Sequence, residues 1–233
     1  MKKIILSIAL MLLFGFKANA DVGVNIGVSL AAGVFEVDGA SEKFSGSHSS
    51  GAGSTVTKKT TDEGENAEGL FGIGSLFVEK TLGDKVSIGI DYVPNALESE
   101  TTENTQTTFN STHGAVLTEV TNTVQVDFED LTTLYAMINL SESFYVKAGM
   151  MEVDVITNDK LNTGSTYGNT SLDGTMFAVG FARDLDNGAF IRLEGSIMEF
   201  DGVTLTSQVD SAKSVSVDGI EGYGAKLSVG KSF

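Results

Sequence analysis

Apolar residues alternate with small or polar residues along much of this chain. Between residues 22 and 31 every second residue is apolar, and Gly, Asn, Ser or Ala stands between them. The same alternation recurs at residues 86–93 and 177–182. A period of two is typical of β-strands, because successive side chains point to opposite faces. The pattern therefore predicts a chain of strands, each with one bulky apolar face and one small or polar face.

The connections between these runs are of two lengths. Short polar links stand at residues 81–84, 141–143 and 186–188. Long polar stretches stand at residues 38–66, 98–121, 158–172 and 201–214. Within the last short link, Asn187-Gly188 is a preferred pair for a tight hairpin turn. Because the two kinds of connection alternate along the chain, they predict eight strands with both chain ends on the side of the short turns.

The second long stretch leaves room for an extra hairpin, which would raise the count to ten strands. Its two arms, residues 92–113 and 114–134, are nearly equal in length and rich in Thr. Residues such as Glu98, Glu100 and Glu103 are too polar to face lipid. We therefore expect the third and fourth strands to extend beyond the membrane and to turn near Thr112-His113-Gly114, and we keep the count of eight.

The chemistry of the polar face separates two all-β folds. A water-soluble sandwich turns its polar face outward and favours large charged side chains there, whereas the polar face here is rich in Gly, Ala and Ser. Small residues suit the interior of a narrow barrel, and the bulky apolar face suits lipid. The sequence thus predicts an eight-stranded antiparallel transmembrane β-barrel with short periplasmic turns and long extracellular loops.

The first twenty residues predict a secretory signal peptide. Lys2 and Lys3 give a basic start, residues 4–16 an apolar run, and Ala18-Asn19-Ala20 a small-residue cleavage site. We expect cleavage between Ala20 and Asp21, which leaves residues 21–233 as a single barrel domain. The chain has no Cys, so neither a lipid-anchored lipoprotein nor a disulfide scaffold is expected.

The last run of the chain carries the most specific signal. From Tyr223 onward apolar residues alternate with Gly, Lys and Ser, and the chain ends in Phe233. A final amphipathic strand with a terminal Phe resembles the assembly signal of bacterial outer-membrane barrels, and residues 21–233 resemble the small OmpA/OmpX-type and opacity-type barrels. Lys231 departs from the apolar alternation, although a Lys at the periplasmic rim can reach the headgroups.

This resemblance covers the architecture of the whole chain and no functional motif. It implies a location in the bacterial outer membrane, contact with outer-membrane lipid and lipopolysaccharide, and insertion by the barrel-assembly machinery with Phe233 as the assembly signal.

Five charged residues fall on the face predicted to line the lumen. They are Asp91, Lys147, Arg192, Glu194 and Lys226. An isolated charge in a narrow interior is costly, so the mixed signs predict ion pairs across the barrel, with Arg192 and Glu194 in one network. The alternative is a gated path for ions. A wide continuous pore is not expected at eight strands.

Few residues are candidates for catalysis or for binding a metal or cofactor. The histidines are His48, in a Ser/Gly stretch, and His113, at the predicted hairpin tip, and neither has a clear catalytic partner. We therefore expect no enzymatic activity, no metal and no cofactor. Aromatic residues near the predicted membrane boundaries are expected to form interfacial girdles. They are Phe71, Tyr92, Phe144, Phe177 and Tyr223.

The net charge of the chain limits the classes of molecule that it is expected to bind. Loss of Lys2, Lys3 and Lys17 with the signal peptide takes the net charge from −16 to −19, which argues against nucleic acid. The sequence favours a monomeric barrel with a role in envelope integrity and in adhesion-like surface interaction through its loops, with a partner that the sequence does not identify. The alternatives are a narrow passive channel for small solutes and a lipid-modifying outer-membrane enzyme.

Overall fold

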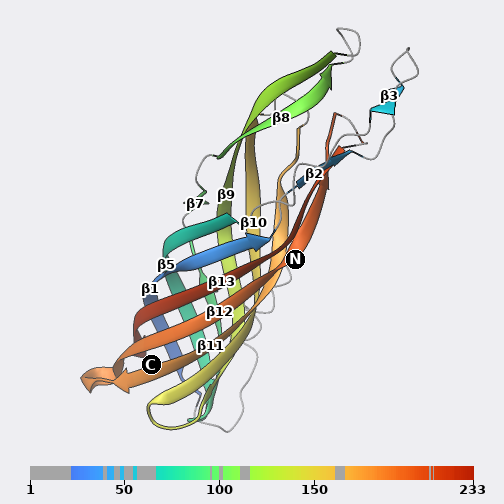
Figure 1. The fold of residues 1–233 in the computed structure, drawn as a ribbon. Helices are drawn as coiled ribbons and strands as arrows, with labels where there is room; N and C mark the ends of the chain where they lie inside the picture. Colours follow the sequence, from blue (N-terminus) through green and yellow to red (C-terminus); the bar gives the residue numbers. More distant parts are fainter. Residues whose placement is uncertain are drawn as a thin grey trace.

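The computed structural model describes residues 22–38, 41–44, 48–49, 55–56, 67–94, 96–99, 102–110, 116–160, 166–209, 211 and 213–233. Most of these residues lie in β-strands (Figure 1). The strands are β1 (Val24–Asp38), β2 (Ser41–Phe44), β3 (His48–Ser49), β4 (Thr55–Val56), β5 (Ala67–Leu82), β6 (Val86–Tyr92), β7 (Leu97–Glu98), β8 (Thr102–Asn110), β9 (Val116–Asn139), β10 (Phe144–Lys160), β11 (Thr170–Asp184), β12 (Ala189–Thr206) and β13 (Lys213–Ser232). Within the described ranges, no helix is long and apolar enough to cross a membrane.

Eight of these strands close into one antiparallel barrel. The order around the barrel is β1, β5, β6, β9, β10, β11, β12 and β13, and β13 pairs back with β1 from Asn25↔Ser232 to Asp38↔Gly219. In hydrocarbon every backbone N–H and C=O needs a partner within the protein, and closure provides one. The predicted eight-stranded antiparallel barrel is confirmed.

Tight turns join the strands at one end of the barrel. Residues 83–85 join β5 to β6, residues 140–143 join β9 to β10, and the short 3-10 segment η2 (Asp186–Gly188) lies between β11 and β12. Asn187 and Gly188 have positive φ angles of 64° and 74°, as the type I′ hairpin turn requires. The C-terminal end of β13 lies at this same end (Figure 1).

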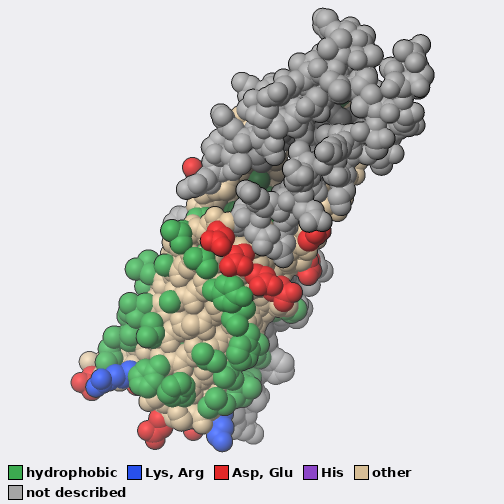
Figure 2. Space-filling model, in the orientation of Figure 1, with side chains coloured by type: hydrophobic (Ala, Val, Ile, Leu, Met, Phe, Trp, Pro, Cys, Tyr) green, Lys and Arg blue, Asp and Glu red, His purple; other side chains and the backbone are tan. Residues whose placement is uncertain are grey.

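The outer surface of the barrel carries a belt of bulky apolar side chains, here called the apolar belt. They face outward, and Leu30 is 71% exposed. Figure 2 shows them gathered over the part of the barrel nearer the short turns, with acidic side chains along the opposite edge. Apolar residues outside and polar residues inside are typical of a barrel in a membrane, with its short turns in the periplasm. The belt includes Ile26, Val28, Leu30, Leu76, Ile138, Phe177, Val179, Ile191, Leu193, Ile197, Leu227 and Val229.

Strand pairing continues beyond the apolar belt into stretches expected to be loops. β12 and β13 stay paired as far as Thr206↔Ser214, although residues 201–214 were predicted as a loop. β8 pairs with β9 from Thr102↔Val124 to Asn110↔Val116, as expected for extended third and fourth strands. The proposed tip at His113 lies outside the described residues. Antiparallel strands can pair outside the membrane because water satisfies their polar side chains.

One member of the predicted aromatic girdle lies on the wrong face. Phe71 is only 6% exposed and packs inside the barrel, with its ring 4.6 Å from that of Phe35. Its neighbour Leu70 faces outward instead and is 86% exposed. Both residues are apolar, so hydrophobicity alone did not decide which of them faces lipid. The remaining girdle residues, Tyr92, Phe144, Phe177 and Tyr223, are exposed.

Candidate functional site

The periplasmic half of the lumen holds a set of charged side chains, here called the lumen network. Asp91 comes from β6, Lys147 from β10, Arg192 and Glu194 from β12, and Lys226 from β13. All five side chains are largely buried, whereas the β12 residues between and beside them face lipid. A register slip of one residue would move Arg192 into lipid, at a cost that is about 2–4 kcal/mol at the bilayer midplane and falls toward the interface.

Arg192 binds a carboxylate that the sequence reading did not assign to the network. Its Nη1 and Nη2 donate hydrogen bonds to Oε1 and Oε2 of Glu79 at 2.5 and 2.8 Å. Glu79, on β5, is 1% exposed and also accepts hydrogen bonds from Asn25 Nδ2 and Tyr135 Oη at 3.0 and 2.8 Å. The guanidinium lies 4.4 Å from the ring centroid of Phe190. This two-point pair is the strongest form of carboxylate contact available to Arg.

Glu194 has a different cationic partner. Lys147 Nζ lies 2.5 Å from Glu194 Oε2, and Tyr145 Oη donates a hydrogen bond of 3.1 Å to the same oxygen. Lys147 also lies 4.8 Å from the ring centroid of Tyr135. Arg192 and Glu194 therefore do not pair with each other. Two tyrosines connect the pairs: the Tyr145 ring centroid is 5.7 Å from the Arg192 guanidinium, and Tyr135 lies between Glu79 and Lys147.

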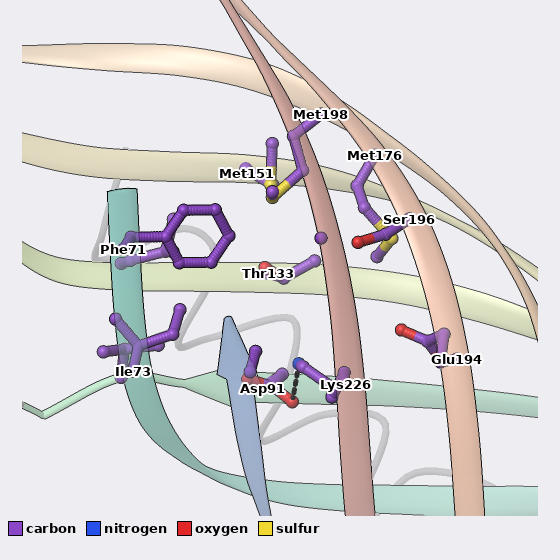
Figure 3. Close-up of a pocket in the computed structure, with 14 residues that line it drawn as sticks. Phe71, Ile73, Asp91, Thr133, Met151, Met176, Glu194, Ser196, Met198 and Lys226 are labelled. Atoms are coloured by element: carbon purple, nitrogen blue, oxygen red, sulfur yellow. Dashed lines mark hydrogen bonds and ion pairs between the residues drawn. The ribbon is translucent and has the colours of Figure 1, made fainter. Parts of the chain in front are cut away.

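The third ion pair joins β6 to β13 beside a small cavity. Lys226 Nζ donates a hydrogen bond of 2.9 Å to Asp91 Oδ2 (Figure 3). Asp91, Glu194 and Lys226 line one part of the cavity, and Phe71 and several Met side chains line another (Figure 3). The cavity volume is about 40 Å³. At about 10–15 Å³ for each water in this measure, it has room for a few water molecules.

The lumen network is neutral and fully paired. Glu79, Asp91 and Glu194 match Arg192, Lys226 and Lys147 one to one. A buried charge is tolerated when it is paired, as each of these is, and Glu79 also has both of its oxygens hydrogen-bonded. The arrangement holds opposite charges in fixed positions across the barrel and fills the space between the strands.

Two glycines make room for the tyrosines of this network. A Cβ built on Gly89 would come within 2.6 Å of the Tyr135 ring and hydroxyl, and one built on Gly180 would overlap the Tyr145 ring. The small residues on the inward face thus have a specific packing role, because each ring lies directly over the backbone of a neighbouring strand.

Above the charged layer the lumen is apolar. Buried side chains of β9 to β13 and Phe71 of β5 form one cluster, which begins at Tyr135 and Ala178 beside the charged layer and continues above it. The cluster contains Phe71, Tyr135, Met151, Val153, Val155, Leu172, Met176, Ala178, Met198, Phe200 and Ile220. The described lumen is therefore filled at two levels, by ion pairs near the periplasm and by apolar side chains toward the outside.

The remaining predicted positions lie outside this network. Ala20, Asp21 and His113 fall outside the described residues, and for His48 only the backbone course, in β3, is described. Phe233 is 72% exposed at the end of β13. Its backbone closes the barrel, since Val24 N donates to Phe233 O at 3.1 Å and Phe233 N donates to Val24 O at 2.9 Å.

Comparison with known proteins gives a likeness of fold and no sequence family. No protein-family model matches the chain, and no curated protein matches its sequence. The outer membrane protein OprG from Pseudomonas aeruginosa matches with 11% identity and a TM-score of 0.51, over 91% of this chain and 95% of its own. AlkL, solved in DMPC lipid bilayers, matches over 94% of both chains with 12% identity and a TM-score of 0.44.

Ail, the attachment invasion locus protein of Yersinia pestis, matches with 10% identity and a TM-score of 0.37, over 90% of this chain and 99% of its own. At such identities a likeness shows the fold alone. The closed barrel, the apolar belt and the fold shared with OprG together show that this chain is a bacterial outer-membrane β-barrel protein.

Proposed function

We propose that this barrel is a plugged structural anchor that supports envelope integrity and contacts a surface partner through its extracellular strands. The observation that carries the proposal is the neutral lumen network, which fills the barrel with three buried ion pairs. A conducting path would require these pairs to separate. Separating such a pair inside the lumen would leave two uncompensated buried charges, which disfavours the open arrangement.

The extracellular strands support the second part of the proposal. β8 pairs with β9 alone among the described strands, so its other edge is left without a partner there. An unpaired strand edge offers N–H and C=O groups to which an extended segment of another protein can add. The β8–β9 hairpin stands beyond the barrel body (Figure 1). We assign the surface contact to this hairpin.

Single-channel recording in planar bilayers tests the plug. The native barrel is expected to give no stable conductance steps, whereas a variant with Glu79→Ala and Arg192→Ala, which removes one whole pair, serves as the positive control. Regular steps from the native barrel would instead support the narrow channel, for which the cavity beside Asp91 and Lys226 is the favourable observation.

Cell binding tests the surface role. Labelled bacteria that display the native barrel are expected to be retained on immobilised matrix proteins. Bacteria in which residues 100–125 are replaced by Asn-Gly should be retained less. Equal retention of the two strains would remove the hairpin from the proposal.

Lipid A mass analysis tests the enzyme alternative. Membranes with and without the barrel are expected to give the same lipid A masses. A species that loses or gains an acyl chain only when the barrel is present would overturn the non-enzymatic proposal.

A further inference from the structure

Three methionine side chains from neighbouring strands line the cavity beside the lumen network. They are Met151 (β10), Met176 (β11) and Met198 (β12), here called the Met triad. The chain has seven Met, and two of them lie in the predicted signal peptide. Three of the other five therefore face one cavity of about 40 Å³.

Strand register brings the Met triad together on the inward face of the barrel. Met176 pairs directly with Met198, and residues directly opposite in antiparallel strands have Cβ atoms about 4.5–5.5 Å apart. Met151 pairs with Gly174, which has no side chain and stands two residues from Met176 on the same face. All three Met side chains are buried. The side chains of three adjacent strands therefore meet at one space inside the barrel.

Space filling alone does not account for the Met triad. Methionine commonly fills irregular gaps in a protein core, because its side chain is unbranched and flexible. A Met that serves only as a filler is expected to close the space around it. Here three flexible side chains surround a cavity that is larger than one water molecule, for which about 10–15 Å³ is enough in this measure. The cavity has room for one metal ion, and the flexible side chains can turn their sulfur atoms toward it.

The polar side of the same cavity favours a cation. Figure 3 shows the Met triad above the Asp91–Lys226 ion pair, with Glu194 beside that pair. Asp91, Glu194 and Lys226 line the cavity, whereas Lys147, the partner of Glu194, does not. The ion pairs are neutral as a whole, but two carboxylates and only one ammonium group face the cavity. A buried cation is tolerated when opposite charge lies near it, and this wall supplies an excess of one negative charge.

We propose that the Met triad binds a soft monovalent metal ion of the Cu⁺ and Ag⁺ class inside the barrel. Thioether sulfur selects such soft ions, whereas hard ions such as Mg²⁺ and Ca²⁺ prefer oxygen ligands. The described residues contain no group of three His, Asp or Glu side chains that could hold a metal ion, so this site depends on its sulfur atoms. The ion lies between the charged layer and the apolar layer of the lumen, where both layers keep competing water away.

Urea unfolding with Ag⁺ tests the proposal on the barrel of residues 21–233 in lipid vesicles. Ag⁺ serves as a probe for Cu⁺ that does not change its oxidation state, and the buffer contains nitrate because silver chloride is insoluble. An ion that binds the folded barrel raises its stability, and slow entry into the lumen does not affect an equilibrium measurement. We expect Ag⁺ to raise the urea concentration at the midpoint of unfolding and Ca²⁺ to leave it unchanged. An unchanged midpoint with Ag⁺ would overturn the proposal.

Replacement of single Met residues by Leu locates the bound ion. Leu nearly conserves the volume of Met and removes the sulfur, so the fold tolerates the change. Met151→Leu, Met176→Leu and Met198→Leu should each weaken the Ag⁺ affinity about tenfold or more, since even residues that only support a metal ligand contribute that much. Met150→Leu, on the lipid face, and Met137→Leu, buried outside the cavity, are matched controls with unchanged affinity. Equal losses in triad and control variants, or no loss in the triad, would show that the ion binds elsewhere.

The pH of the assay separates thioether from imidazole ligands. The histidines of the chain are His48 and His113, and imidazole must lose its proton to bind a metal, so a His site weakens below about pH 6.5. A thioether has no proton to lose, and binding at the Met triad should be equal at about pH 5 and about pH 7.5. X-ray absorption of bound Cu⁺, kept reduced with ascorbate in the absence of oxygen, should show sulfur as the nearest neighbour. Weaker binding at the lower pH, or nearest neighbours of nitrogen or oxygen alone, would overturn the Met triad as the site.

Discussion

Arg192 is held by a two-point ion pair and by aromatic rings at the same time. Glu79 accepts both of its hydrogen bonds, and the rings of Phe77, Tyr145 and Phe190 lie within 6 Å of the guanidinium carbon. Aromatic faces attract a cation through their negative ring centres. The surroundings of Arg192 therefore replace most of the water that a free guanidinium would bind.

Removal of Glu79 should be among the most damaging single changes. Glu79→Ala leaves Arg192 as an unpaired buried charge and is expected to lower the free energy of unfolding by about 3–5 kcal/mol. Replacing both residues with Met should cost less than the single change. Urea unfolding in lipid vesicles gives these values, and Glu142→Ala, in an exposed turn, is the control.

Double-mutant cycles of unfolding free energies distinguish the two acidic residues near Arg192, Glu79 and Glu194. Because Glu194 pairs with Lys147, the coupling between Arg192 and Glu79 should exceed that between Arg192 and Glu194. A larger coupling with Glu194 would contradict the pairing described for the lumen.

Glycine under a tyrosine ring gives a second test at this scale. Gly180→Ala places a methyl group in the space of the Tyr145 ring and should cost about 1–3 kcal/mol through overpacking. Gly195→Ala is the matched control, since no heavy atom lies within 4 Å of its added Cβ. If both variants lose equal stability in the urea assay, the loss reflects strand glycines in general and not this contact.

The charges on the predicted lumen face show how much of the lumen network the sequence predicts. Alternation along β12 was enough to place Arg192 and Glu194 inward, because the lipid penalty for the opposite register is large. The predicted set held three cations and only two acids, and that imbalance was the available sign of a missing carboxylate. The sequence does not predict that Glu79 faces the lumen. Residues 76–78 beside it are all apolar, so its strand has no clear alternation.

At the scale of elements, pairing extends farther than the hydrophobic pattern predicts. Val203 pairs with Val217 and Leu205 with Val215, with Thr and Ser between them. This weaker alternation predicts a loop because its outward residues are polar. Polar outward residues are unfavourable only inside the membrane, so the strands can stay paired beyond it. The hydrophobic pattern therefore marks the membrane-spanning part of each strand and not the strand's end.

The β8–β9 hairpin should be dispensable for folding. Ser99 N donates a hydrogen bond of 2.8 Å to Val126 O, so Asn-Gly in place of residues 100–125 can close a turn there. Among the removed residues that the structure describes, only Thr123, Val124 and Gln125 also pair with β10. Because an isolated two-stranded hairpin is marginally stable, the loss should change the free energy of unfolding by less than about 1 kcal/mol. Urea unfolding with circular dichroism measures this change, and a loss of several times that size would show that the hairpin supports the barrel.

At the scale of the whole molecule, Phe233 should matter for assembly more than for stability. Its exposed ring makes little packing contact, while its backbone bonds to Val24 survive a change of side chain. Phe233→Asp should therefore lower the amount of barrel in the outer membrane, whereas the same variant refolded into vesicles should unfold at nearly the native urea concentration. Native levels of the variant in cells would contradict its role as an assembly signal.

The pairing of β1 with β13 fixes the order in which this protein can be made. The hydroxyl groups of Ser29 and Ser228 lie 2.9 Å apart although 199 positions separate them in the chain. Until β13 arrives, both β1 and β12 present bare edges that hydrocarbon does not tolerate. Contacts between such distant segments also form slowly. The barrel therefore cannot enter the membrane strand by strand during synthesis, and the first strand must be kept from aggregating until the last has been exported.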